Sequence, residues 1–247
     1  MARTDPERDA ILRRLQGERG NVFRAGGPRV AMLYPSPYRA GMSSLGYQWI
    51  LHNLRQDGFS AERAFLPDDV EGALRARRGL VTYETRTPLS KFRVVAVSLA
   101  YELELAGLVQ ALELAGIPPL RRDRGPWDPI IVLGGPLTFS NPLPASPFVD
   151  AMLLGESEDQ VSEVIGSAID DARPVFLDRV QATPGGFVPE RDGVNLPPVA
   201  KAADDRLPAR GSILAPEAEL RDMFLIEGER GCHRQCTFCV MRRSTNG

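Results

Sequence analysis

Residues 94–136 read VVAVSLAYELELAGLVQALELAGIPPLRRDRGPWDPIIVLGGP. Val94–Ser98 and Pro129–Leu133 are short apolar runs bounded by turn residues, which is typical of strands buried on both faces of a parallel sheet. Between them, Glu102–Ala115 carries leucines and alanines at helical spacing and is closed by a glycine. The stretch therefore predicts a strand–helix–strand unit.

The same pattern recurs on both sides of this unit. Further strands are predicted at Arg29–Tyr34, Glu62–Leu66 and Asp150–Leu154, and further helices at about 44–56 and 158–170. Alternating strands and helices with turn residues between them indicate one doubly wound parallel α/β sheet over residues 29–171. Ligands of such sheets bind at the carboxyl ends of the strands. The loops 35–41, 98–101, 134–138 and 155–157 are therefore the candidate binding loops.

The composition is that of an ordinary globular protein. The 247 residues are 43% hydrophobic and 25% charged, and the formal net charge is -2. This charge gives no general attraction to nucleic acid or to an anionic membrane surface. No apolar run approaches the roughly 20 residues that span a bilayer, and Met1–Gly20 lacks the apolar core of a secretory signal. We therefore expect a cytoplasmic protein without a membrane partner.

Three further segments flank the predicted sheet. Residues 1–28 form an N-terminal extension with a helix at Asp5–Gln16. Residues 172–221 are expected to be an extended, partly strand-like connector, because Arg173–Leu220 contains seven of the 21 prolines. Residues 222–247 begin with a predicted strand, Met223–Glu227, which leads directly into the cysteines.

The chain has three cysteines, Cys232, Cys236 and Cys239, all within its last sixteen residues. An odd number at such close spacing does not indicate a disulfide framework, and it is more typical of a metal site in a reducing compartment. Thiolates are soft ligands for iron–sulfur clusters or zinc. A structural zinc site is usually closed by four protein ligands, so zinc would need His233 or His52 as well. A three-cysteine cluster would leave one iron open.

The cysteine segment resembles that of radical S-adenosylmethionine (SAM) enzymes. The resemblance consists of the Cys-x3-Cys-x2-Cys spacing, an aromatic residue, Phe238, before the last cysteine, and Arg230-Gly231 before the first. It implies that the three cysteines hold a [4Fe–4S] cluster after the first strand of a (β/α)6 barrel. SAM would bind the open iron, with Phe238 beside its adenine. The implied activity is reductive cleavage of SAM to methionine and a 5′-deoxyadenosyl radical. An electron donor such as flavodoxin or ferredoxin would be a partner, and the substrate stays unidentified.

The candidate binding loops resemble those of cobalamin-binding domains. Such domains have a serine after one strand and paired glycines after the next, and here Ser98, Gly134, Gly135, Gly155 and Glu156 match. The glycines would let the backbone approach a corrin or its nucleotide tail closely. The alternative is that Gly134-Gly135 is an ordinary turn and that Ser98 caps the following helix.

The first loop departs from that pattern. Many cobalamin enzymes place an aspartate and a histidine before a glycine there, whereas this chain has Ser36, Tyr38 and Gly41. A neutral tyrosine is a poor cobalt ligand. The domain would then hold cobalamin without a protein histidine on cobalt, or it has kept the fold and lost the cofactor.

The order of cobalamin-type domain, proline-rich connector and cysteine loop covers about Arg29 to Gly247 and is similar to a group of radical SAM proteins of undefined reaction. Because the sequence ends eight residues after Cys239, we expect a truncated barrel and no turnover by this polypeptide alone. The alternative function is a non-catalytic cobalamin- or metal-binding module.

Five other residues of types that often occur in functional sites are predicted to have structural roles. Glu102 and Glu104 are predicted to be charges on the surface of a helix rather than an acid/base pair. Trp49 and Trp127 are predicted to be packing residues rather than stacking platforms, and His52 to be partly buried on its helix.

Overall fold

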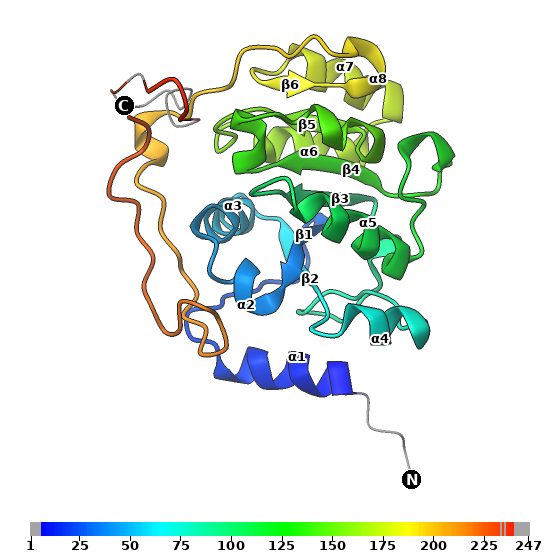
Figure 1. Cartoon of the computed structure of the whole chain (residues 1–247), viewed down its shortest axis with the longest axis vertical. Helices are drawn as coiled ribbons and strands as arrows, with labels where there is room; N and C mark the ends of the chain where they lie inside the picture. The colour runs from blue at the N-terminus through cyan, green and yellow to red at the C-terminus, as the bar shows by residue number, and fades with distance from the viewer. Residues whose placement is uncertain (1–5, 233, 235, 240–247) are drawn as a thin grey trace.

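A computed structural model of the chain describes residues 6–232, 234 and 236–239. Its centre is a six-stranded sheet in the order β2-β1-β3-β4-β5-β6, seen edge to edge in Figure 1. Neighbouring strands are parallel from β2 to β5, and β6 is antiparallel to β5. The strands are β1 (Arg29–Pro37), β2 (Ser60–Leu66), β3 (Val94–Ser98), β4 (Ile130–Gly134), β5 (Ala151–Leu153) and β6 (Gly186–Phe187).

Helices cover both faces of the sheet. They are α1 (Pro6–Gly17), α2 (Tyr38–Gly41), α3 (Leu45–Gln56), α4 (Val70–Arg75), α5 (Glu104–Ala115), α6 (Val161–Asp170), α7 (Arg173–Ala182) and α8 (Pro189–Asp192). Buried side chains of α1, α3, α6 and α7 join one hydrophobic cluster, and those of α4 and α5 join the other. Alternate residues of β1, such as Met32 and Leu33, point into opposite clusters. The predicted doubly wound α/β fold is confirmed.

The strand order locates the edge at which ligands are expected to bind. The chain crosses from β1 to β2 on one side and then to β3 on the other side of β1. Sheets with the 2-1-3-4-5 order bind ligands at the carboxyl ends of the strands near this reversal. Local signals in the sequence fix the elements there. Val94–Ser98 forms β3 with the predicted bounds, and the Ser44 hydroxyl caps α3 by accepting from the Tyr47 amide at 3.4 Å.

The prediction of an extended connector is wrong for its first residues. Arg173–Ala182 forms α7, in which Phe176 and Val180 are fully buried against the sheet. Gly186–Phe187 then pairs with β5 as β6, which agrees with the strand-like character predicted for part of this segment. The prolines do not prevent a helix here. Pro174 lies in the first turn of α7, where its missing N–H breaks no helical hydrogen bond. The domain boundary after residue 171 stays a prediction.

The predicted strand Met223–Glu227 is also absent from the part of the chain that the structure describes. There the described residues form one isolated bridge, between Ile226 and Arg210, through the backbone hydrogen bonds of Leu225 and Glu227 on either side. Met223, Phe224 and Ile226 are more than half exposed. An apolar run becomes a strand only where a neighbouring strand takes up its backbone hydrogen bonds, and these residues have such a neighbour at one position alone.

Residues 199–230, which we call the connector hairpin, run along the outside of the molecule and return. In Figure 1 this orange segment descends from β6 to α1 and comes back up beside itself. It is attached by bridges of Ala200 to Gly155 and of Leu214 to Arg19. Its two arms pair where the Gly211 amide donates to the Leu225 carbonyl at 2.8 Å. Among the described helices, none is long and apolar enough to cross a membrane.

Candidate functional site

A cleft of about 310 Å³ lies at the carboxyl ends of β3, β4 and β5. Its floor is formed by apolar strand residues, and its sides by Gly46 and Ile50 of α3 and by Val161 and Ile165 of α6. Its mouth is polar, with Glu156, Glu158, Glu227 and Arg230. A largely apolar cleft with a few polar groups at one end is the usual form of a small-molecule or cofactor site.

The five residues predicted from the strand-end loops all line this cleft. They are Ser98, Gly134, Gly135, Gly155 and Glu156. They lie at the carboxyl ends of β3 and β4 and in the loops after β4 and β5, up to 58 residues apart in the sequence, and the parallel sheet brings them together. Whether they bind cobalamin stays a prediction.

The packing of the protein itself explains two of the glycines. Gly135 has a φ of 101°, and a Cβ there would lie 2.6 Å from the Leu99 carbonyl oxygen. Gly155 has a φ of 95°, and its Cβ would lie 2.6 Å from the Ala200 carbonyl oxygen. Only glycine tolerates both conditions. Gly134 differs, because the nearest atom to its Cβ would be the Ser157 Oγ at 4.0 Å, so this position is open.

The mouth of the cleft is organised around Arg230. Its Nε and Nη2 donate to the two carboxylate oxygens of Glu227 at 2.7 and 3.0 Å. Its Nη1 donates to Glu158 at 2.6 Å and lies 3.9 Å from a Glu156 oxygen. Burial acts to lower the pKa of Arg230, but its hydrogen bonds with Glu227 and the charge of Glu158 outweigh this and raise it. Sequence reasoning noted Arg230 only as part of a motif and missed this ion cluster.

The same carboxylates hold the connector hairpin. A Glu156 oxygen accepts from the Ala202 amide, and a Glu227 oxygen accepts from the Ala209 amide, both at 2.9 Å. The polar mouth is therefore built from the loop after β5 and from both arms of the hairpin.

Tyr38, from the first loop, takes no part in the cleft. It is fully buried in α2, and its hydroxyl donates to Glu18 at 2.7 Å. Burial first, and then the Glu18 carboxylate, raise the pKa of Tyr38 well above its ordinary value. A buried neutral phenol that is engaged elsewhere is unsuited to bind a metal.

Glu104 is a buried residue, so its prediction as a surface charge is wrong. It is 3% exposed and accepts from the Ser36 hydroxyl at 3.1 Å and from the Ala100 amide at 2.7 Å. Burial and the Glu104 charge together raise the pKa of Tyr34. Glu104 thus joins the end of β1 to the loop after β3, whereas Glu102 is exposed as predicted but lies just before α5.

The two tryptophans differ. Trp49 is buried, and His52 stacks on it with ring centroids 5.3 Å apart. Burial, followed by the charges of Arg210 and Arg55, lowers the pKa of His52. Trp127 is 96% exposed, so its prediction as a packing residue is wrong. It follows a glycine and a proline in a surface loop between α5 and β4, where an aromatic residue need not be buried.

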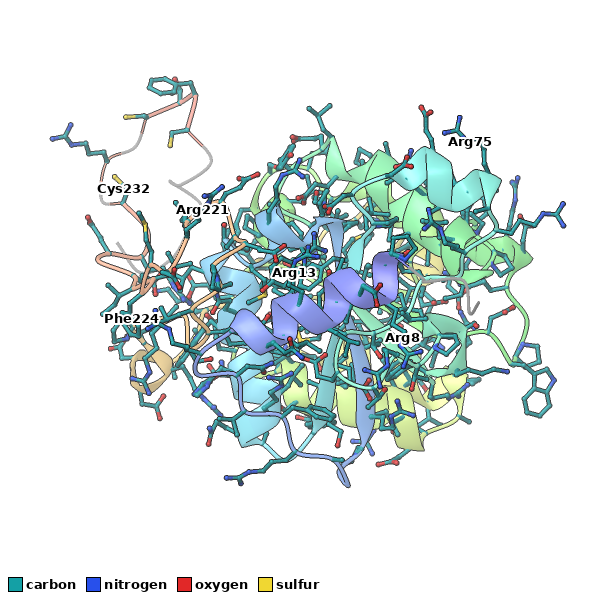
Figure 2. All side chains as sticks on the ribbon, turned by 90° about the horizontal axis from the view of Figure 1, so that it is seen from below. Arg8, Arg13, Arg75, Arg221, Phe224 and Cys232 are labelled. Atoms are coloured by element: carbon teal, nitrogen blue, oxygen red, sulfur yellow. The ribbon has the colours of Figure 1, made fainter. Side chains whose placement is uncertain are left out.

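Cys232, Cys236 and Cys239 are all partly exposed, and Phe238 is 90% exposed. Figure 2 shows Cys232 at the periphery, on the same side of the molecule as Arg221 and Phe224. The Cys239 amide donates to the Cys236 carbonyl at 3.2 Å, which closes a tight turn between these two cysteines. In the described part of the chain the thiols are not gathered into a metal-binding group. His233 lies outside the described residues.

A family model described as the N-terminal region of radical SAM proteins matches residues 46–189, more than half of the chain. The chain belongs to this family. The radical SAM membership predicted from the cysteines and the strand-end loops is thereby confirmed. The matched residues include α3 through β6 and so most of the cleft.

Two relatives extend the radical SAM comparison. An uncharacterized protein of Methanocaldococcus jannaschii is 25% identical over 218 residues, which are 86% of this chain and 41% of that protein. The radical SAM methyltransferase TsrM of Kitasatospora setae, solved with its tryptophan substrate and a SAM analogue, gives a TM-score of 0.51 at 14% identity. The match covers 89% of this chain and 42% of TsrM, and it supports the fold. The chain thus spans less than half of either relative.

A second TsrM structure contains cobalamin and a [4Fe–4S] cluster. It gives a TM-score of 0.43 at 17% identity over 76% of this chain and 32% of TsrM.

Proposed function

We propose that Cys232, Cys236 and Cys239 hold a [4Fe–4S] cluster and that the whole radical SAM protein cleaves SAM reductively. When bound, the cluster would pass one electron from flavodoxin or ferredoxin to the SAM sulfonium, whose C5′–S bond breaks into methionine and the 5′-deoxyadenosyl radical. The chain spans less than half of its relatives, so this activity belongs to a protein with a complete barrel.

The donor set suits this cluster. Three thiolates within eight residues are soft ligands for iron and leave one iron free for SAM. The turn between Cys236 and Cys239 keeps two of the ligands on one short loop. Phe238 is exposed beside them, and we propose that it packs against the adenine of SAM.

One observation carries the proposal: the cysteine segment starts at the mouth of the cleft. Glu227 and Arg230 line the cleft, and Cys232 follows two residues later. A ligand in the cleft and a cluster on the cysteines would therefore be neighbours. An enzyme that uses a cleft ligand and a cluster in one reaction needs the two close together.

We further propose cobalamin as the ligand of the cleft. Its largely apolar lining suits the nucleotide tail, and Gly134 leaves the strand end open beside Ser98. Cobalamin would supply a carrier for methyl or related transfer. Because Tyr38 is buried and Ser36 donates to Glu104, neither side chain is available to cobalt. The cofactor would then be held without a protein ligand from this loop.

Anaerobic reconstitution with iron and sulfide tests the cluster. We expect about four iron atoms per chain, and a loss of most of this iron in Cys232→Ala, Cys236→Ala or Cys239→Ala. Ser98→Ala, which changes the cleft and no cysteine, is the matched control and should keep the full iron content. Stoichiometric zinc, with no cluster formed under reducing conditions, would contradict the proposal.

Hydroxocobalamin tests the cleft. After incubation and desalting, we expect protein-bound corrin absorbance in the wild type and in Cys232→Ala. Retained corrin without any cluster would instead favour the non-catalytic binding module. Absence of bound corrin in both proteins would show that the fold has lost this cofactor.

A further inference from the structure

Arg230 joins two segments that are far apart in the sequence. Its Nε and Nη2 grip Glu227 on the returning arm of the connector hairpin, and its Nη1 crosses to Glu158, 72 residues earlier, before α6. The planar guanidinium is suited to such a grip because its N–H groups point in fixed directions. Arg230 is therefore a non-covalent cross-link between the hairpin and the mouth of the cleft.

The cross-link is shielded from water. The side chains of Arg230, Glu158 and Glu227 are 13%, 7% and 16% exposed. Without the guanidinium, the carboxylates of Glu156, Glu158 and Glu227 would repel one another in a partly buried place. The mouth of the cleft thus depends on Arg230, and loss of this side chain would push the returning arm away.

The cysteine segment begins directly after this cross-link. Only Gly231 separates Arg230 from Cys232, and Gly231 has a φ of 84°, a turn that glycine makes without strain. The last firm attachment before the three cysteines is therefore a side chain that also lines the cleft.

We infer that Arg230 is a positioning residue that latches the cysteine segment to the mouth of the cleft. The latch sets where the cysteines lie, and a ligand that fills the cleft contacts the same guanidinium. The inference deepens the proposed function and rests on it only for the identity of the ligands.

Thiol alkylation of the metal-free chain tests the latch. Under anaerobic, reducing-agent-free conditions at 25 °C, iodoacetamide should modify Cys232 about tenfold faster in Arg230→Ala than in the wild type, the size expected for losing charged hydrogen bonds. Mass spectrometry of the peptides gives the rate for each cysteine. Equal rates in the two proteins would overturn the latch.

A matched control separates positioning from general stability. Arg206 pairs with Asp159 at 3.3 Å, again between the hairpin and the loop before α6, but neither residue lines the cleft. Arg206→Ala should leave the cysteine rates within about twofold of the wild type, as expected for an exposed ion pair. Equal acceleration in both variants would show that any loosening of the hairpin exposes the cysteines, which contradicts a specific latch.

Conservative variants sharpen the result. Arg230→Lys keeps the charge but cannot grip Glu227 with two nitrogens while it reaches Glu158, so it should fall between the wild type and Arg230→Ala. Glu158→Gln keeps the shape and removes one charge, and it should also accelerate alkylation. Wild-type rates in Glu158→Gln would overturn the cross-link to the cleft wall.

Hydroxocobalamin adds a test of the shared guanidinium. If the wild type retains corrin, its alkylation rates should change on binding, and this change should be lost in Arg230→Ala. Retained corrin with unchanged wild-type rates would overturn the coupling. If no corrin is retained, the proposed cobalamin site fails, while the latch is still decided by the rates of the ligand-free proteins.

Discussion

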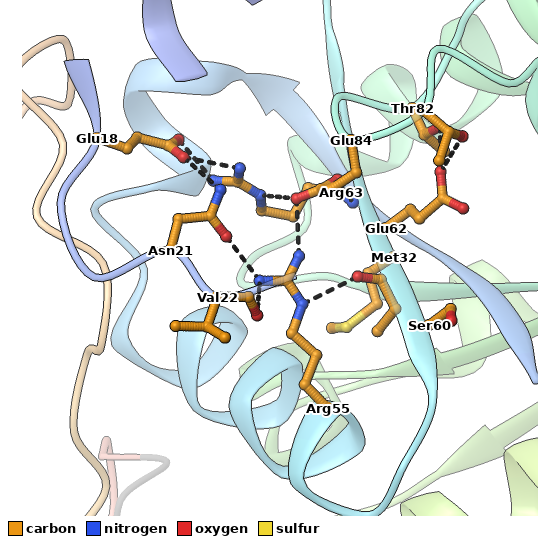
Figure 3. Close-up of polar contacts among 12 residues, drawn as sticks. Glu18, Asn21, Val22, Met32, Arg55, Ser60, Glu62, Arg63, Thr82 and Glu84 are labelled. Carbon is orange, nitrogen blue, oxygen red and sulfur yellow. Dashed lines mark hydrogen bonds and ion pairs between the residues drawn. The ribbon is translucent and has the colours of Figure 1, made fainter. Parts of the chain in front are cut away.

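Helix α3 takes part in two regions built on opposite principles. Near its start, Gly46 and Ile50 line the apolar cleft. Near its end, Arg55 joins a buried ion network, which we define as Glu18, Arg55, Arg63 and Glu84 and which is shown in Figure 3. The cleft leaves space at the carboxyl ends of the strands, whereas the network fills the space between β2 and the N-terminal segment with paired charges.

Every charged group of the network has an opposite partner. Arg63, which is fully buried, bonds Glu18 at 2.6 and 2.9 Å and Glu84 at 2.7 Å. Arg55 bonds Glu84 at 2.7 Å. At the cleft, by contrast, charged groups occur only at the mouth. The network therefore fixes how the N-terminal segment packs against β2, whereas the cleft leaves space for a ligand.

The largest expected effect is the loss of the central arginine. Arg63→Ala leaves Glu18 and Glu84 buried without their main partner, and we expect a loss of about 3–5 kcal/mol of unfolding free energy. Urea denaturation measures it. The exposed pair of Arg13 and Glu217 provides the control, because Arg13→Ala should leave the urea midpoint close to that of the wild type. Similar losses of stability in both variants would show that the buried network stabilises the fold no more than a surface ion pair does.

Acid should weaken the network through Glu84. Burial raises the pKa of Glu84, but the charges of Arg63 and Arg55 outweigh it and hold this pKa below its ordinary value of 4.5. The stabilisation is therefore present above pH 4.5 and is lost as the pH falls through the lower pKa of the folded state. Urea denaturation at several pH values should show a steeper acid loss for the wild type than for Glu84→Gln. Parallel curves would mean that Glu84 is not ionised in the fold.

The glycine at the wall of the cleft should have an intermediate effect. Gly155→Ala combines a positive φ with a Cβ 2.6 Å from the Ala200 carbonyl oxygen, and we expect a loss of about 2 kcal/mol in thermal or urea unfolding. Gly26 has a φ of 111° with no atom within 4 Å of its Cβ. Gly26→Ala should therefore lower the unfolding free energy less. An equal loss would show that the Ala200 backbone can move away from a Cβ at position 155.

The smallest change in stability is expected for Gly134→Val, which should nevertheless clearly weaken hydroxocobalamin binding. Gly134→Val fills open space at the cleft and should alter the unfolding free energy by less than about 1 kcal/mol. It should weaken hydroxocobalamin retention about tenfold, because the added methyl groups occupy the cleft. Gly166→Ala, in α6 outside the cleft lining, is the control and should bind normally. Unchanged binding in Gly134→Val would place the corrin elsewhere.

Local patterns in the sequence predicted most of the sheet. The apolar runs at Val94–Ser98 and Pro129–Leu133 identified β3 and β4 because a strand buried on both faces needs continuous apolar residues. The loops of the cleft followed from the rule that ligands lie at carboxyl ends of parallel strands. Helix α7 was missed because Pro174 concealed the helical spacing of Phe176 and Val180.

Long-range polar contacts left no local pattern to recognise. Glu18 and Arg63 are 45 residues apart, and Arg230 and Glu158 are 72 apart. A charged residue is usually exposed, so Glu104 was predicted to lie at the surface, and no sequence pattern marked Arg63 as buried. The run Met223–Glu227 looked like a strand because its composition indicates burial, whereas strand formation also depends on a partner.

The double attachment of the connector hairpin has a consequence for proteolysis. One arm is fixed to the cleft by the bridge of Ala200 to Gly155, and the other by Arg230 on Glu158. A cut in the exposed turn at residues 219–222 would therefore leave each new end anchored to the same body. The nicked protein should still migrate as one particle in gel filtration, with its cysteines retained beside the cleft.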